Sequence, residues 1–72
     1  MDKKTTTQKV YIFIKDYTKK HTHPPTMREI GEACYLSTSA VTRHLDKLEW
    51  EGKILREEGR ARGITLLEPD DD

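Results

Sequence analysis

Short hydroxyl side chains and one arginine occupy the run STSAVTR, from Ser37 to Arg43. At the expected start of a helix, Ser37 and Thr38 would bring hydroxyl and backbone N–H groups close to a phosphate. Small side chains let a helix approach DNA closely, and arginine can pair bidentately with guanine. The pattern therefore predicts groove reading, with an ordinary solvated face as the alternative. On the helical period, the residues turned away from the apolar side are Ser39, Thr42, Arg43 and Asp46.

Arginines also occur in a predicted hairpin tip at residues 58–62. Arg60 and Arg62 lie in this tip, where a guanidinium could reach a phosphate or enter a narrow minor groove. The adjacent Glu57 and Glu58 would offset part of this charge. We expect the tip to contact DNA, and a solvated turn is the alternative.

Histidine and cysteine are the remaining candidates for site chemistry. His21 and His23 stand in a proline-rich loop, far from the single Cys34, and this is not a zinc-ligand spacing. Cys34 falls on the apolar side of a short helix, where cysteine acts as a small hydrophobe. His44 is expected to pack at the edge of the core or to face a phosphate. With no catalytic spacing of serine, cysteine or carboxylates, we expect neither a metal, a cofactor nor an enzyme.

Local signals place the first two helices. Capping boxes at Thr5 with Gln8 and at Thr26 with Glu29 mark two helix starts. The first helix is predicted over residues 6–21 and ends before two prolines. The second is short. Its expected buried residues are Ile30, Ala33 and Cys34, and those of the first helix are Val10, Phe13, Ile14 and Tyr17.

A third helix and a hairpin follow. The helix is predicted from about Thr38 to Glu51, after Ser37 as its N-cap and before Gly52 as its stop. Residues 53–57 and 63–67 are predicted as strands because β-prone runs flank a glycine-containing tip. The inward residues of the helix are Val41, Leu45 and Leu48, and the basic residues of the first strand are Lys53 and Arg56.

Composition predicts one small domain. The 72 residues contain no apolar run near the roughly 18 residues of a membrane span. A lone cysteine fits a reducing cytoplasm. Thirteen basic and thirteen acidic residues give a formal net charge of zero. Four of the acids lie in residues 68–72, an expected flexible tail, and without them the charge is +4. The domain itself is predicted over residues 1–67.

Trp50 lies seven positions after Arg43 and therefore on the outward side of the third helix. A large exposed aromatic side chain usually has a partner. We expect Trp50 to pack beneath the hairpin. The alternatives are that Trp50 contacts the DNA backbone or another protein.

Two segments of the chain resemble a known family. The run PPTMREIGEA from Pro24 to Ala33, and RGITLL from Arg62 to Leu67, are similar to the N-terminal DNA-binding domain of LexA-type SOS repressors. The resemblance extends from about Thr6 to Leu67 and departs at Tyr35, where those repressors usually have glycine. It implies a winged helix-turn-helix with the third helix as recognition helix and residues 58–62 as the wing. The residues it directs toward base edges are Ser39, Ala40, Thr42 and Arg43.

The sequence thus predicts a mainly α winged helix-turn-helix with a small β-hairpin. We expect a transcriptional regulator, a repressor, that binds double-stranded DNA as a homodimer in the cytoplasm at the nucleoid. Lys47 and the wing would hold phosphates. One alternative is a protein-interaction adaptor that uses the face bearing Trp50. Another is the DNA-binding fragment of a longer repressor, whose self-cleaving serine–lysine domain would lie outside this chain.

Overall fold

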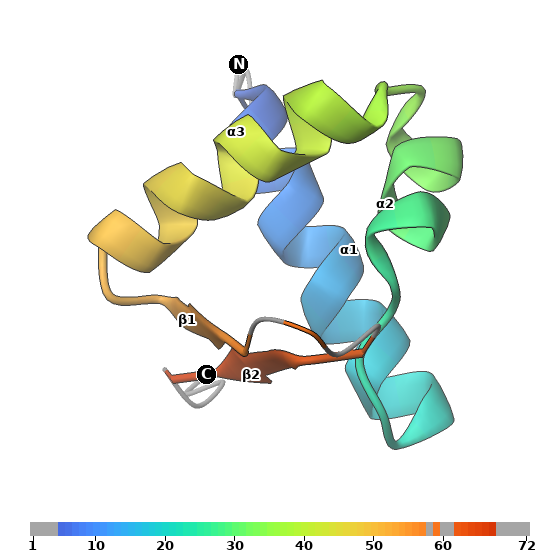
Figure 1. Ribbon diagram of the computed structural model, residues 1–72. Coiled ribbons are helices and arrows are strands. Elements are labelled where there is room, and N and C mark those ends of the chain that lie inside the picture. Colours follow the sequence, from blue (N-terminus) through green and yellow to red (C-terminus); the bar gives the residue numbers. More distant parts are fainter. Residues whose placement is uncertain (1–4, 58, 60–61, 68–72) are drawn as a thin grey trace, which may run out of the picture.

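The computed structural model describes residues 5–57, 59 and 62–67. They form helices α1 (Thr6–His21), α2 (Met27–Cys34) and α3 (Thr38–Trp50), followed by strands β1 (Ile54–Arg56) and β2 (Ile64–Leu66). Helix α3 lies across α1, with α2 beside them and the hairpin beyond the end of α3 (Figure 1). The predicted winged helix-turn-helix is confirmed. The wing tip is only partly described, since residues 58, 60 and 61 fall outside these ranges.

Helix starts follow the predicted capping boxes. The Thr5 hydroxyl accepts from the Gln8 N–H at 3.1 Å, and the Gln8 side chain accepts from the Thr5 N–H at 2.9 Å. Thr26 and Glu29 repeat this arrangement at 3.1 and 2.8 Å. In each box the backbone N–H groups of the first and last residue both find a partner within three residues. The first turn of each helix is therefore held by local hydrogen bonds that do not depend on tertiary packing.

The buried face of α2 differs from the expected one. Ala33 is exposed and Cys34 only half-buried, whereas Gly31 is buried beside Ile30. The turn after α2 folds back over Gly31, so that a Cβ atom there would lie 2.7 Å from the Leu36 carbonyl oxygen. Gly31 therefore belongs to the side of α2 that faces the protein interior. The prediction that Ala33 is buried was wrong.

The turn between α2 and α3 passes through a left-handed residue. Tyr35 caps α2 with φ 59° and ψ 48°, and its backbone N–H donates to the Gly31 carbonyl. Ser37 then begins α3, with its hydroxyl accepting from the Ala40 N–H at 3.2 Å. A change of helix direction in so few residues mounts α3 rigidly across α2, as a helix-turn-helix requires.

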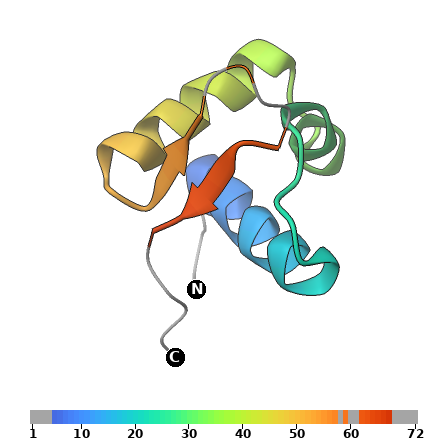
Figure 2. The same ribbon diagram turned by 60° about the horizontal axis from the view of Figure 1, so that its bottom comes forward.

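The two strands pair antiparallel, with Leu55 opposite Thr65. Each has three residues, shorter than the predicted runs, although backbone hydrogen bonds continue past both ends. The Glu57 N–H donates to the Gly63 carbonyl at 2.8 Å, and the Leu67 N–H donates to the Lys53 carbonyl at 2.9 Å. Figure 2 shows the hairpin lying over α1 and α3, with the start of β2 close to the segment before α2.

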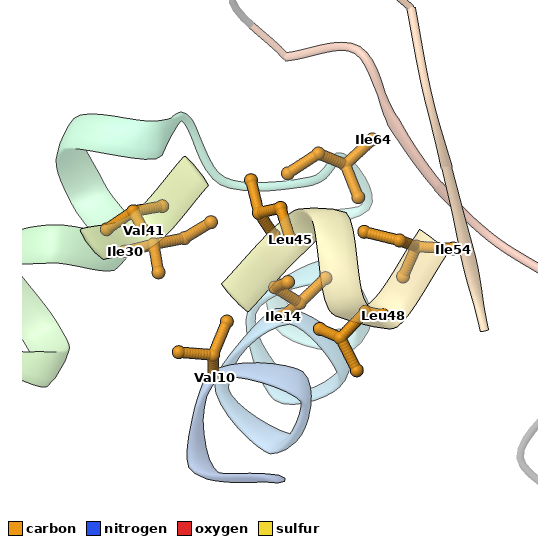
Figure 3. Packing of buried hydrophobic residues seen from close by; sticks show 8 residues of the cluster. All are labelled: Val10, Ile14, Ile30, Val41, Leu45, Leu48, Ile54 and Ile64. Atoms are coloured by element: carbon orange, nitrogen blue, oxygen red, sulfur yellow. The ribbon is translucent and has the colours of Figure 1, made fainter. Parts of the chain in front are cut away.

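A single core connects all five elements (Figure 3). Its α3 members are those predicted, and each strand contributes one isoleucine. Helix α1 is further tied to α3 by a hydrogen bond of 2.8 Å between the Thr7 hydroxyl and Nδ1 of His44. These contacts decide which side of α3 faces away from the protein. The buried hydrophobic residues are Val10, Ile14, Ile30, Val41, Leu45, Leu48, Ile54 and Ile64.

Candidate nucleic-acid interface

The outward face of α3 is the first part of the candidate interface. Burial of Val41, Leu45 and Leu48 turns the opposite side of the helix to solvent. Ser39 and Arg43 are exposed there. The small Ser39 side chain would let this face approach DNA closely, and the Arg43 guanidinium can form two parallel hydrogen bonds to a guanine.

Not every predicted residue on this helix faces fully outward. Thr42 and Ala40 are half-buried, since they lie at the two margins between the core stripe and the exposed face. Thr38 is exposed, and the exposed Ser37 uses its oxygen to cap the helix. The Ser37 oxygen is therefore engaged as an acceptor, while its hydroxyl proton remains for donation.

Lys47 marks one side of this face. It is exposed and borders a hollow of about 270 Å³ where the start of α1, the end of α3 and the start of the hairpin meet. Lys53 borders the same hollow, with its ammonium 5.3 Å from the centre of the Tyr11 ring. Two lysines thus flank α3 on its α1 side, at a position suited to a phosphate chain.

On the wing, Arg62 is bonded within the protein. Its Nη1 and Nη2 atoms lie 3.0 and 3.1 Å from the two carboxylate oxygens of Glu29. Nη1 also donates to the Pro24 carbonyl at 2.8 Å, and the guanidinium carbon lies 5.9 Å from the Tyr17 ring centre. Arg62, two residues before β2, therefore joins the base of the wing to α1 and α2. This use was missed because Glu29 and Arg62 are 33 residues apart.

The shared carboxylate of Glu29 has an altered acidity. The Arg62 guanidinium, followed by the Thr26 N–H, lowers the pKa of Glu29 from 4.5 to about 2. The same ion pair raises the pKa of Arg62. One side chain thus caps α2 and holds the base of the wing.

Arg56 also points back to the protein. From β1 its Nη2 atom pairs with Asp46, and its Nε atom lies 3.2 Å from the Glu49 carboxylate. Both acids belong to α3. The sequence had suggested Arg56 as part of a basic wing, but its charge is met by these two carboxylates. Arg60, the other predicted wing contact, lies outside the described residues.

Trp50 does not pack beneath the hairpin. It lies at the last position of α3 and is 88% exposed, because it stands on the side of the helix opposite the buried Val41 and Leu45. The expectation of a packed indole was therefore wrong. Its remaining candidate partners are DNA or another macromolecule.

His44 and Cys34 serve packing, whereas His21 and His23 are exposed. His44 is half-buried against Thr7, and burial raises the pKa of the Cys34 thiol. Over residues 5–57, 59 and 62–67, no three histidine, cysteine or carboxylate side chains gather to hold a metal ion. None of the helices in these ranges has the length and apolar character to cross a membrane.

Comparisons with known proteins agree with this geometry. The LexA DNA binding domain family matches residues 1–63. A LexA repressor of Exiguobacterium is 45% identical over 64 residues, covering 88% of this chain and 31% of the relative. A LexA repressor of Listeria monocytogenes is 44% identical over 66 residues, covering 90% and 32%. One of Clostridium botulinum is 46% identical over 61 residues, covering 83% and 30%. The chain thus spans less than a third of the length of these curated relatives.

Proposed function

This chain belongs to the LexA DNA binding domain family, and on that premise we propose that it is a sequence-specific DNA-binding module of a transcriptional repressor. Helix α3 would enter the major groove, and the wing would contact the backbone or the minor groove. The observation that carries this proposal is the exposed side of α3, where Ser39 and Arg43 stand opposite the buried Val41 and Leu45.

Each candidate residue has a distinct part in the proposed complex. Arg43 would pair with a base edge, while Ser39, Ala40 and Thr42 would allow close approach of the helix. Other residues, which carry positive charge or lie at the start of α3, would hold phosphates. These phosphate-binding residues are Ser37, Thr38, Lys47 and Arg60. Arg62 would act by anchoring the wing.

We propose two copies per binding site. A recognition helix of 13 residues reads only a short half-site, so a winged helix gains specificity by binding two half-sites in a symmetric duplex. Action on chromosomal DNA would place the protein at the nucleoid, in the cytoplasm. The repressor activity of the longer relatives, named LexA repressors, supports the direction of regulation.

Selection of bound duplexes from random DNA tests the proposal. We expect enrichment of one palindromic motif, and a complex on that duplex with the mass of two protein chains. The matched control is the same duplex with its half-sites scrambled. Equal retention of motif and scrambled duplexes at every salt concentration would contradict sequence-specific binding.

The wing has its own test. Arg60→Ala is expected to weaken binding to all duplexes alike and to reduce the slope of log K against log salt by about one, since one phosphate contact is lost. Binding titrations over a range of salt concentrations measure this slope. If the slope of the variant equals that of the wild type, Arg60 does not bind a phosphate.

A protein-binding role is the second candidate, and the exposure of Trp50 favours it. Trp50 is the only tryptophan of the chain, so acrylamide quenching of its fluorescence reports on this one side chain. Quenching that persists in the DNA complex would leave the Trp50 face open to a protein partner. Protection by DNA would assign Trp50 to the DNA interface instead.

A further inference from the structure

Helix α3 carries negative charge on the side that the proposed function turns toward DNA. The Asp46 side chain is 60% exposed and lies one turn after Arg43. Glu49 follows one turn later, with its side chain 35% exposed. A carboxylate close to a phosphate chain opposes binding, because like charges repel most strongly at short range. Asp46 is thus the acid beside Arg43, and Glu49 adds a second negative charge nearer the hairpin, so a positive charge that pairs with both would favour DNA binding.

Arg56 provides that charge from a neighbouring element. It lies on β1 opposite Ile64 and reaches α3 with two different nitrogen atoms, Nη2 to Asp46 and Nε to Glu49. Its side chain is 25% exposed, so solvent and salt screen this pair less than a fully exposed one. A guanidinium that bonds two acceptors through separate N–H groups has a restricted orientation. Arg56 is thus held against α3 and directed away from solvent.

We propose that Arg56 is a positioning residue for DNA binding, which acts by offsetting part of the negative charge of Asp46 and Glu49 at the recognition helix and does not itself bind DNA. This inference rests on the proposed function and concerns the same face of α3. With Arg56 present, the three side chains carry a net charge of −1. Without it they carry −2, and both acids would stand unpaired beside the phosphate chain.

The same pairing accounts for how a chain with no net charge can bind DNA. Affinity for a phosphate chain depends on the charge of the contacting face and not on the total. Arg56 cancels acid at that face, while Lys47 and Arg43 remain exposed on it. The formal charge of zero therefore underestimates the attraction at α3.

The experiment compares three proteins on the selected duplex and over a series of salt concentrations. These are the wild type, Arg56→Ala, and the triple variant with Arg56→Ala, Asp46→Asn and Glu49→Gln. We expect Arg56→Ala to bind roughly tenfold more weakly at low salt, and this loss should shrink as the salt concentration rises, because salt screens the repulsion between the unpaired acids and the phosphates. The triple variant is expected to return to within about twofold of the wild type, since the unpaired acids are gone.

Arg28→Ala is the matched control. Arg28 pairs with Glu32 on the exposed side of α2, at 3.7 Å, and its removal changes the total charge by the same amount. We expect this variant to bind within about twofold of the wild type. Circular dichroism confirms folding, and Arg56→Gln replaces the alanine variant if the hairpin is lost.

Two results would overturn the inference. A triple variant as weak as Arg56→Ala would mean that Arg56 acts through its own DNA contact or through the hairpin geometry. A salt slope that stays reduced by about one in the triple variant would identify a lost phosphate contact of Arg56 directly. Failure of the wild type to bind any selected duplex would instead contradict the proposed function, and the inference would fall with it.

Discussion

Arginine side chains in this domain differ in what surrounds them, and this difference supports distinct proposed roles for them. Arg43 is exposed on α3. Arg56 and Arg62 are each bonded to carboxylates on a neighbouring helix. A guanidinium already bound to carboxylates has fewer N–H groups for DNA, so we propose base reading for Arg43 and positioning for the other two.

The role of Arg43 gives a prediction at the residue scale. Arg43→Ala should reduce discrimination between the preferred and substituted base at one position of each half-site by about 1–3 kcal/mol, because a bidentate pair is lost. Competition titrations with duplexes substituted at each position measure this. Arg28→Ala, on α2, is the control. If Arg43→Ala weakens all duplexes equally, Arg43 binds the backbone and does not read a base.

At the scale of elements, the turn between α2 and α3 contains an uncommon backbone conformation. Tyr35 has φ 59° although it carries a Cβ atom, and its side chain is 92% exposed. A left-handed conformation costs a residue with a Cβ roughly 1–2 kcal/mol, and glycine avoids this cost. No packing of the ring offsets it, so the turn stores a modest strain.

Tyr35→Gly is therefore expected to stabilise the domain by about 0.5–1 kcal/mol, after allowing for the greater freedom of glycine in the unfolded chain. The midpoint of thermal unfolding should rise by about 4–8 °C for each kcal/mol. Tyr35→Ala removes the ring but keeps the Cβ atom, and it should not stabilise. Equal stabilisation by both variants would show that the ring, and not the backbone, is responsible.

For the whole molecule, the ion pair between Glu29 and Arg62 connects the wing to two helices. The Arg62 guanidinium and the Thr26 N–H lower the pKa of Glu29 from 4.5 to about 2. A lowered folded-state pKa contributes stability above the unfolded pKa, and this contribution is lost as the pH falls toward the folded value. The domain should therefore lose stability as the pH is lowered from 4.5 to about 2.

Glu29→Gln should be less stable than the wild type near neutral pH and should lose part of this acid dependence. Urea unfolding at a series of pH values measures both effects. Glu32→Gln is the control, because Glu32 pairs with Arg28 only at the surface, at 3.7 Å. Acid dependence that is identical in Glu29→Gln and the wild type would exclude this carboxylate as its source.

Local patterns in the sequence were sufficient for most of the architecture. The start of α1 at Thr6 and of α2 at Met27 follow from hydrogen bonds that span three residues. The buried side of α3 follows from the helical period. The hairpin was placed correctly, with longer strands than those observed. The assignment to a LexA-type DNA-binding domain also came from short motifs, and the family match confirms it.

The amino-acid sequence by itself determined the helix starts, the core stripe of α3 and the exposed side opposite that stripe, because these depend on hydrogen bonds and side-chain periods within a few residues. Only the tertiary structure decided that Arg62 meets Glu29, that Arg56 meets Asp46, and that Trp50 stays exposed. Those outcomes depend on the distances between elements. Such distances are set when the isoleucine, leucine and valine side chains of five elements pack together, and no local spacing encodes them.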